Sequence, residues 1–290
     1  MTLDTGSPEA PAEVRRQQMV DFIGKQEYVR VAELVDRFTV SEVTIRADLA
    51  ALHRRGLVTR VRGGAMPTRR LVSERSFEET TAKFPREKAA IGAAAAALVR
   101  DGESIAIDVG TTTAALARAL VRRTELQQLT VFTNGLRIAS ELEVAIPRIT
   151  VVVTGGTLRP MQHSLVDPMA SAIFDRIRPH IVFLGASALD AVHGVTNVNV
   201  PEAELKLRMA RAGRRVVLLV DGSKLGEVDV AQVCPASALD LVVTGRSAPA
   251  EQLDALAEAG VDVLVTPELD QDSDDEVGAT ARLALPEEDE

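Results

Sequence analysis

The chain has 290 residues, of which 46% are apolar, so it is long enough for two domains with hydrophobic cores. Its net charge of −9, taken as a whole, argues against a nucleic-acid-binding protein. The charge is uneven, however, because residues 13–70 hold twelve Lys and Arg against seven Asp and Glu, whereas residues 71–290 hold 21 against 33. A basic first segment followed by an acidic remainder is typical of a protein in which one domain docks on phosphates.

The chain ends, the apolar runs and the single cysteine favour a cytoplasmic protein without a membrane partner. Residues 1–12 are polar, contain Pro and Gly, and lack the order of a signal peptide, so we expect a disordered lead. The apolar run at 91–99 is far shorter than the roughly 20 residues of a membrane span. Cys234 has no partner for an internal disulfide. Residues 267–290 hold ten acidic residues against one arginine and are expected to be a disordered acidic tail.

Residues 39–56 carry the pattern of a helix that reads DNA. Ser41 is a good N-cap, and apolar residues recur at helical spacing from Ile45 to Leu52. Thr44 and Arg46 then lie on the opposite face near the helix N-terminus, where they can reach base edges or phosphates in a major groove. An ordinary amphipathic helix with a solvated basic edge is the alternative for this stretch taken alone.

The residues around this helix complete a small DNA-binding module. Residues 57–64 alternate apolar and basic side chains before two glycines, which predicts a hairpin wing with its arginines facing phosphates or a minor groove. Residues 13–26 and 29–38 have helical apolar spacing. The sequence therefore predicts an N-terminal all-α winged helix-turn-helix at 13–66, with DNA contacts from Ser41, Thr44, Arg46, Arg54, Arg60 and Arg62.

The remainder of the chain alternates strand and helix patterns. Residues 67–85 are polar and are expected to be a linker, and 86–100 form an alanine-rich helix. Short apolar runs predict buried strands at 103–108, 129–133, 148–154, 180–186, 214–221, 240–245 and 261–266, with helices at 112–123, 135–144, 166–177, 201–212 and 248–259. Regular alternation predicts a Rossmann-like α/β domain at 86–266 with an open, mostly parallel sheet.

Polar residues and glycines gather where the predicted strands end. Because ligands of open parallel sheets bind at the carboxyl ends of the strands, these residues predict one binding site. The turn at 110–113 offers a glycine, three hydroxyls and free N–H groups at a helix start, which suits an anion. The predicted set is Asp108, Gly110, Thr111, Thr112, Thr113, Asn134, Gly155, Gly156, Asp190, Glu202, Lys206 and Lys224, with Glu202 and Lys206 as an i, i+4 pair. Turn chemistry alone is the alternative for each of them.

Both halves of the chain resemble the DeoR family of bacterial transcriptional regulators. The N-terminal stretch is VSEVTIRADLAALHRRGLVTRVRGGA, and the motifs DVGTTT, VFTNG, TGGTLR, FLGASALD, EAELK and DGSKLG follow in the order of the family's C-terminal sensor domain. The resemblance implies a sensor fold similar to ribose-5-phosphate isomerases and coenzyme A transferases, with a phosphorylated sugar as effector and its phosphate at Gly110 to Thr113. Departures from the family pattern are Ala47, Arg62, Asp167, Pro179-His180 and Thr244-Gly245.

The function expected from these features is a sequence-specific repressor of carbohydrate-metabolism genes, modulated by a phosphorylated sugar and acting on double-stranded operator DNA. One helix and one wing read few base pairs, so we expect at least a dimer. A sugar-phosphate isomerase fused to a DNA-binding domain is the alternative; the stretch HGVTNVNVPEAE, which has no lysine and little glycine, disfavours it. The four histidines lack metal-ligand spacing, so no catalytic residue, metal or cofactor is expected.

Overall fold

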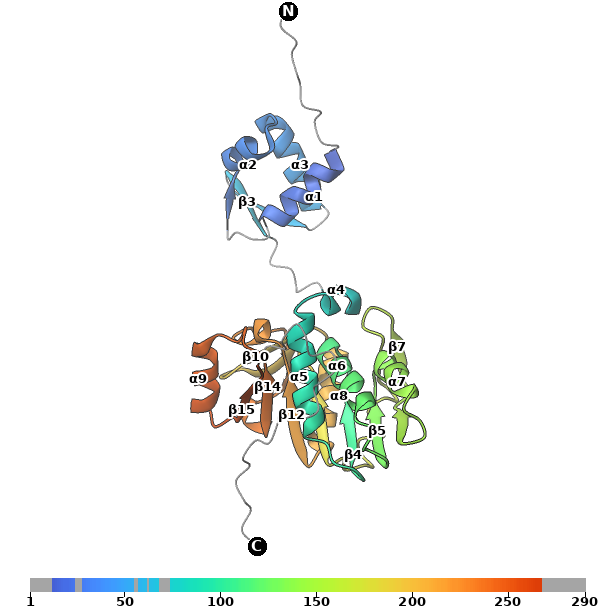
Figure 1. The fold of residues 1–290 in the computed structure, drawn as a ribbon. Coiled ribbons are helices and arrows are strands. Elements are labelled where there is room, and N and C mark those ends of the chain that lie inside the picture. The colour runs from blue at the N-terminus through green and yellow to red at the C-terminus, as the bar shows by residue number, and fades with distance from the viewer. Residues whose placement is uncertain (1–11, 24–27, 55–56, 62, 68–73, 268–290) are drawn as a thin grey trace, which may run out of the picture. The chain divides into compact units, whose positions relative to one another are not determined.

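The computed structural model describes residues 12–23, 28–54, 57–61, 63–67 and 74–267 (Figure 1). The chain divides into two compact units, Met1–Ser73 and Glu74–Glu290, which we call the DNA-reading unit and the sensor unit. Three predictions lie outside the described residues: the lead before Ala12, the acidic tail beyond position 267, and the role of Arg62.

The DNA-reading unit contains the predicted three helices and wing. The helices are α1 (Ala12–Ile23), α2 (Val31–Phe38) and α3 (Glu42–Arg54), and the strands are β1 (Val29–Arg30), β2 (Val58–Val61) and β3 (Gly64–Pro67) in the antiparallel order β1-β3-β2. The prediction that a helix begins at residue 29 is wrong, because Val29 pairs with Ala65 as a third strand. Gly64 permits this pairing, since a Cβ there would lie 2.2 Å from the Val29 carbonyl oxygen.

A buried ion pair joins the first helix to the reading helix. Asp48 of α3 is 1% exposed, and its carboxylate accepts hydrogen bonds from Arg15 Nε at 2.8 Å and Arg16 Nε at 2.7 Å, both on α1. The apolar core beside it includes Ile45, Leu49 and Leu52, the stripe that the sequence predicted. Asp48 therefore holds α3 against α1. The spacing of apolar residues could not predict this contact, because Asp48 is polar.

The sensor unit is built on one seven-stranded parallel sheet. Its strands are β4 (Ser104–Ile107), β5 (Leu129–Thr133), β6 (Ile149–Val153), β9 (Ile181–Leu184), β12 (Arg215–Leu219), β14 (Leu241–Thr244) and β15 (Val263–Val265), and each matches a predicted strand. The order is β15-β14-β12-β9-β4-β5-β6 with all neighbours parallel. The chain order reverses between β4 and β9, which is the switch point where open sheets bind ligands.

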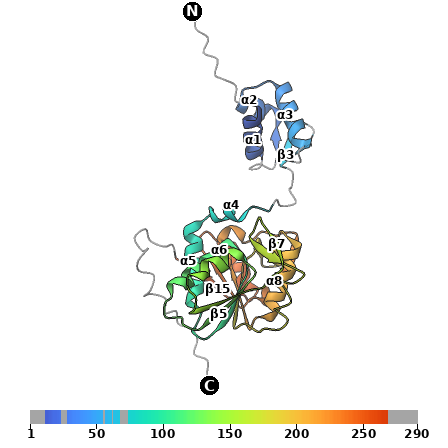
Figure 2. The ribbon, with the colours of Figure 1, turned by 90° about the vertical axis from the view of Figure 1, so that its right-hand side faces the viewer.

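Helices cover both faces of this sheet, as Figures 1 and 2 show for α5 and α6 on one side and α8 on the other. The first face carries α5 (Pro85–Ala97), α6 (Thr111–Arg122) and α7 (Leu136–Glu143), and the second carries α8 (Val200–Ala212) and α9 (Ala250–Glu258). Successive strand residues alternate between the two cores: Ile105 and Ile107 join the first, and Ala106 joins the second. Burial on both faces explains why these strands are nearly continuously apolar.

Several smaller elements were not predicted. A hairpin of β7 (Thr157–Arg159) and β8 (Ser164–Val166) follows β6, and β10 (Ala188–Asp190), β11 (Gly194–Asn197) and β13 (Ala231–Cys234) form an antiparallel sheet. Two 3₁₀ turns lie at Gly222–Lys224 and Ala236–Ala238. The predicted linker 67–85 is too long, because α4 (Phe77–Thr81) and its flanks from Glu74 onward belong to the sensor unit.

The helix predicted at 166–177 is wrong. Val166 ends β8, and residues 167–176 form successive turns. Pro168 has no N–H and disfavours a helical conformation at the residue before it. Asp167 Oδ1 instead accepts from the Ser171 N–H at 3.0 Å, which competes with a helical ladder.

We predict that Asp48→Ala lowers the free energy of unfolding of the DNA-reading unit by about 3 kcal/mol, because two arginines lose a buried partner. Tyr28 is the only tyrosine of a chain without tryptophan, so urea titration followed by tyrosine fluorescence reports on this unit alone. Glu42→Ala is the control: it removes an exposed i, i+4 pair with Arg46 and should cost less than about 0.5 kcal/mol. Equal losses in the two variants would contradict the role of Asp48.

Candidate DNA-reading surface and effector site

The start of the reading helix is capped as the sequence predicted. The Thr44 N–H donates to Ser41 Oγ at 3.2 Å, and the two hydroxyls lie 2.9 Å apart. Arg46 is half exposed and donates from Nε to Glu42 Oε1 at 2.7 Å, so an intrahelical partner holds it on the outer face. Because Glu42 already contacts Nε and one terminal nitrogen, a contact from Arg46 to a base edge or a phosphate would use the remaining N–H groups or displace Glu42.

The exposed face of α3 also contains apolar residues that the prediction omitted. Val43 is 77% exposed and Ala47 is also exposed, both on the face that carries Arg46. Small apolar side chains on a reading helix can contact the methyl group of thymine. Arg54 in the last turn and Arg60 on β2 are exposed, as a phosphate contact requires.

Asp108 lies at the centre of the predicted effector site. It follows β4 directly at the switch point and is fully buried. Its Oδ2 accepts from the Gly185 N–H at 3.0 Å, just after β9, and from Lys206 Nζ of α8. Lys206 also donates to the Gly185 carbonyl at 3.1 Å. Three separate parts of the chain therefore meet at one carboxylate.

The second oxygen of this carboxylate is unsatisfied. Asp108 Oδ1 is buried and has no hydrogen-bond partner among the residues that the structure describes. Burial raises the pKa of Asp108 above its ordinary value, and the nearby Lys206 charge opposes that rise. A buried acceptor without a donor is costly, so this oxygen is suited to a ligand hydroxyl.

The predicted anion turn lies directly beside this carboxylate. Gly110 has a φ of +154° and begins α6, where Thr111, Thr112 and Thr113 are all buried. Thr113 Oγ1 donates to the Gly110 carbonyl at 3.0 Å, which fixes the turn. Asn134, which follows β5, accepts through Oδ1 from the Val109 N–H at 3.0 Å. A residue at the end of the neighbouring strand β5 therefore helps to fix the backbone just before the predicted anion turn.

Glu202 and Lys206 lie on α8 at the predicted i, i+4 spacing, but their ion-pair partners lie on other elements. Both are buried on α8, but Lys206 pairs with Asp108, whereas Glu202 Oε1 accepts from Ser164 Oγ at 2.6 Å and from Arg159. Each finds a stronger partner on another element, because the i, i+4 attraction between side chains is small. Arg159 and Ser164 were missed by the prediction, although Arg159 ends the TGGTLR motif.

The other four predicted positions lie at or beside turns. Gly156, beside Gly155 in the turn after β6, leaves room for β8, since a Cβ would lie 2.3 Å from the Val166 oxygen. Asp190 Oδ1 accepts from the N–H groups of residues 192 and 193, which lowers its pKa and closes the β10–β11 turn. Lys224 is partly exposed in the turn that follows β12.

A buried lysine lies close to Lys224 and was not predicted. Lys88 of α5 is 3% exposed and donates to the Thr80 carbonyl at 2.6 Å, while the Asp221 carboxylate is 3.9 Å away. Burial lowers the pKa of Lys88, and the Asp221 charge opposes this shift. The lysine therefore places a buried positive charge, with Asp221 as its ion-pair partner, at the carboxyl edge of the sheet.

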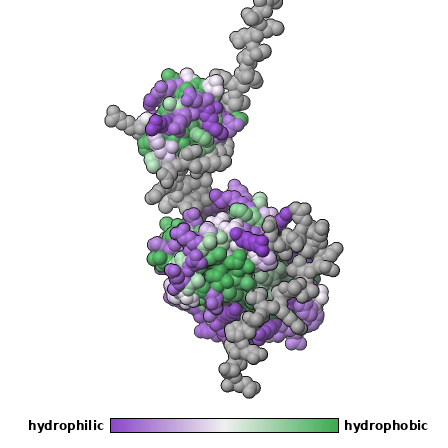
Figure 3. Space-filling view, turned by 60° about the vertical axis from the view of Figure 1, so that its left-hand side comes forward, coloured by the Kyte–Doolittle hydropathy of each residue, from purple (hydrophilic) through white to green (hydrophobic). Residues whose placement is uncertain are grey.

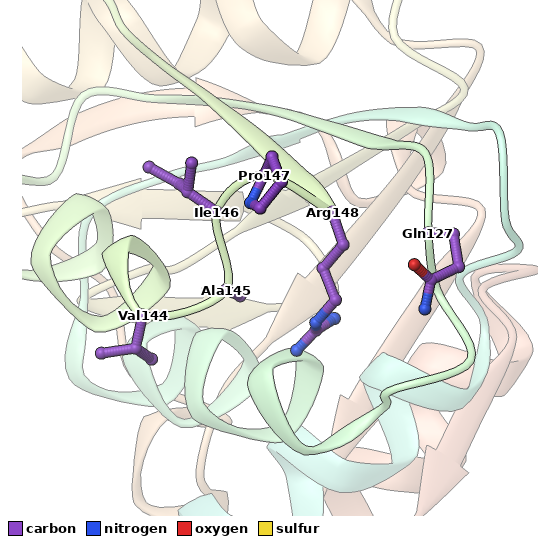
Figure 4. Close-up of a pocket in the computed structure, with 6 residues that line it drawn as sticks. All are labelled: Gln127, Val144, Ala145, Ile146, Pro147 and Arg148. Atoms are coloured by element: carbon purple, nitrogen blue, oxygen red, sulfur yellow. The ribbon is translucent and has the colours of Figure 1, made fainter.

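A surface hollow of 360 Å³ lies at the opposite edge of the sheet. Figure 4 shows its lining by Gln127 and residues 144–148, at the amino ends of β5 and β6. The Arg148 guanidinium donates to the carbonyls of Arg123 and Leu126 at 3.1 and 3.3 Å, beyond the end of α6. This arginine closes a helix end, and the hollow is separate from the predicted effector site.

The described residues contain no group of three or more His, Cys, Asp and Glu side chains that could hold a metal ion. Within the same residues, no helix is long and apolar enough to cross a membrane. Burial raises the pKa of the Cys234 thiol to about 11, so it is unreactive at neutral pH.

Two family models match this chain. The DeoR-like helix-turn-helix domain matches residues 15–69, and the DeoR C-terminal sensor domain matches residues 83–246. The chain is 33% identical to the transcriptional regulator GlpR of Haloferax volcanii, over 88% of this chain and 97% of that protein. It is 30% identical to the transcriptional regulator GolR of Listeria innocua, over 87% and 97%. It is 28% identical to the transcriptional repressor CsqR of Escherichia coli, over 91% and 97%.

Among solved structures, a probable sor operon regulator from Shigella flexneri aligns with a TM-score of 0.42 at 13% identity, over 60% of this chain and 90% of that one. Ribose 5-phosphate isomerase A of Methanocaldococcus jannaschii aligns with a TM-score of 0.35 at 18% identity, over 47% and 52%.

We predict that Lys206→Met makes the stability of the sensor unit fall steeply with pH. A carboxyl whose folded pKa lies above its unfolded value binds its proton more tightly when folded, so stability falls as pH rises above about 4. Without Lys206 the pKa of Asp108 rises further. The free energy of unfolding of the variant at pH 8 should therefore be about 3 kcal/mol below that of the wild type.

Urea denaturation followed by circular dichroism at pH 5 and pH 8 measures this difference. Adding Asp108→Asn to Lys206→Met should restore the pH profile, because no buried charge then remains unpaired. A Lys206→Met profile that runs parallel to the wild type would exclude the buried ion pair.

Proposed function

This chain belongs to the DeoR family of transcriptional regulators, and on that premise we propose that a phosphorylated sugar, bound at the carboxyl edge of the sensor sheet, controls its affinity for operator DNA. As a family member the chain is a DNA-binding transcriptional repressor with a sugar-phosphate sensor domain, and it is not an enzyme. The effector, the target genes and the residues of the two sites are our proposal. We place the protein in the cytoplasm and its targets among carbohydrate-metabolism genes.

The unsatisfied Asp108 oxygen is the single observation that carries this proposal. It requires a hydrogen-bond donor, which a sugar hydroxyl supplies. The helix start at Gly110 offers N–H groups and the positive end of a helix dipole to a phosphate a few residues away. A ligand with hydroxyls at one end and a phosphate at the other fits this pairing of an acceptor with an anion site.

The positive charge at this edge supports the same class of ligand. Lys206 is committed to Asp108. Burial and the nearby Lys224 charge lower the pKa of Lys88, and the Asp221 carboxylate opposes that shift. An added phosphate would compensate these charges. We therefore include Lys88 and Lys224 in the proposed site as groups that favour an anionic ligand over a neutral sugar.

The proposed mechanism is thermodynamic linkage. An effector that prefers the arrangement with weaker DNA binding lowers operator affinity by the ratio of its affinities for the two arrangements. Two half-sites read by a dimer would supply the specificity that one helix and wing lack. The space-filling view in Figure 3 shows an apolar patch on the visible face of the sensor unit, which suits an interface between copies.

We predict that the two arginine classes act differently on DNA. Arg46→Ala should cost about 1–3 kcal/mol on the operator and relax its sequence preference, because Arg46 lies on the reading face. Arg60→Ala should weaken all sequences and reduce the salt slope by about 1, as expected for a phosphate contact. Titrations of operator and scrambled DNA at several salt concentrations separate the two. Identical behaviour of both variants would refute this division.

For the effector site we predict that Thr112→Val combined with Lys224→Ala abolishes thermal stabilisation by a phosphorylated sugar. The substitution removes a hydroxyl at the helix start and one positive charge, and DNA binding should persist. The melting temperature with and without each of ribose 5-phosphate, fructose 1-phosphate and glucose 6-phosphate is the measurement. Thr124→Val, just beyond the other end of α6, is the matched control and should retain the shift. Retained stabilisation in the double variant would mean that the site is misplaced.

A further inference from the structure

The segment ahead of α5 is tied to the β7–β8 hairpin. We call residues 74–84, which include α4, the α4 segment; it is the part of the sensor unit nearest in sequence to the DNA-reading unit. The Phe77 N–H donates to the Met161 carbonyl at 2.9 Å, and the Phe77 ring lies edge-on to His163 with centroids 5.8 Å apart. His163 Nε2 lies 2.8 Å from Glu78 Oε1. The loop of the hairpin therefore holds the α4 segment at several points.

The other end of the same hairpin lies in the effector site. The Leu165 N–H donates to the Asn134 carbonyl at 2.8 Å, and Ser164 Oγ donates to Glu202 at 2.6 Å. Asn134 in turn supports the anion turn through the Val109 N–H. A change at the effector site therefore reaches the hairpin directly, without passing through the sheet.

Arg159 connects the two regions in one side chain. It ends β7, and its two terminal nitrogens donate to Glu202 in the effector site and to Glu74 at the start of the α4 segment. All three side chains are largely buried, at 18%, 6% and 17% exposed for Arg159, Glu202 and Glu74. A buried guanidinium shared between two carboxylates is a strong contact with a fixed geometry.

The two carboxylates are held unequally. Glu202 is fixed on α8 and also accepts from Ser164, at the same oxygen that Arg159 contacts. Glu74 lies at the chain end of the α4 segment, outside any helix. A ligand hydroxyl that donates to Glu202 competes with Arg159 for that oxygen. Because the guanidinium is planar and rigid, a shift away from Glu202 also changes its contact with Glu74.

We propose that Arg159 is the positioning residue that transmits occupancy of the effector site to the α4 segment. A ligand that displaces Arg159 from Glu202 also weakens the contact between Arg159 and Glu74. The identity of the ligand rests on the function proposed above, but the connection between Glu202, Arg159 and Glu74 does not. If the hairpin only stabilised the domain, variants at Arg159 or Glu74 would lower the free energy of unfolding without changing ligand affinity. If ligand binding weakens the contact between Arg159 and Glu74, then removing that contact must in turn strengthen ligand binding, because the coupling between the two is reciprocal.

Hydrogen exchange of the full chain, measured by mass spectrometry, tests the connection without ligand. Glu74→Gln should raise exchange of the amides in residues 74–84 about tenfold and leave those of α9 and β14 unchanged. Arg159→Lys should do the same, because a lysine cannot span both carboxylates in one plane. Glu141→Gln, which removes an exposed pair with Arg118 between α6 and α7, is the matched control and should change neither region. Unchanged exchange of 74–84 in both variants would overturn the proposal.

Ligand titration supplies the readout that a purely structural role would not move. Ribose 5-phosphate, fructose 1-phosphate and glucose 6-phosphate are each added to the wild type and to Glu74→Gln. The sugar that protects amides 108–113 should speed exchange of 74–84 in the wild type and should bind Glu74→Gln about fivefold more tightly. Equal or weaker binding by Glu74→Gln would overturn the proposal while leaving the proposed effector class intact. If none of the three sugars protects 108–113, the proposed effector class is contradicted and so is transmission of its occupancy by Arg159, while the ligand-free comparison still tests whether Arg159 holds the α4 segment.

Discussion

The buried pairing of Asp108 with Lys206 is the interaction on which the sensor unit depends. It lies at the one point of the sheet where the chain order reverses, and it joins the ends of β4 and β9 to α8. Neither charge could be buried alone at this depth, so the pair fixes α8 against the sheet edge. Glu202, one turn earlier on α8, is thereby positioned to contact the β7–β8 hairpin.

The pairing would allow the proposed site both to bind a ligand and to respond to it. One oxygen of Asp108 is used by the fold and the other has no donor among the described residues, so the same carboxylate could serve the fold and the proposed ligand. A ligand hydroxyl that donates to Asp108 Oδ1 would add a contact, whereas one that donates to Glu202 would displace an existing donor. That exchange would be the physical basis of the response that we propose.

Patterns of apolar residues predicted most of the architecture. All seven strands of the parallel sheet and the reading helix were placed correctly, because burial on both faces leaves a short continuous apolar run and burial of one helix face leaves apolar residues at helical spacing. The helix expected at 166–177 failed because Pro168 and the Asp167 side chain break the ladder that the apolar spacing suggested. The α4 segment was taken for linker because a single turn of helix with one buried phenylalanine has no period to detect.

The sequence predicted which residues gather at this edge of the sheet, but not how they pair. Asp108, Gly110, Asn134 and Lys206 come together as expected, since the carboxyl ends of parallel strands share an edge. Partners far apart in sequence, such as Arg159 with Glu74 and Glu202, leave no local signal.

Two departures from the family pattern also gain a reason. Gly245 lies against Glu87: a Cβ at position 245 would come within 2.2 Å of that side chain, which would have to move. His180 Nδ1 accepts from the Ser104 N–H at 3.1 Å, which places it in a structural contact at the amino edge of the sheet.

The most direct test of the central claim is the affinity of the full chain for DNA from upstream of its own gene, at fixed salt. The affinity is measured alone, with one phosphorylated sugar, and with the same sugar without its phosphate. The account predicts that one phosphorylated sugar changes the affinity at least about fivefold and that its neutral form does not. An affinity that no phosphorylated sugar alters, or that both forms alter equally, would contradict an anion-dependent effector site at the switch point of the sheet.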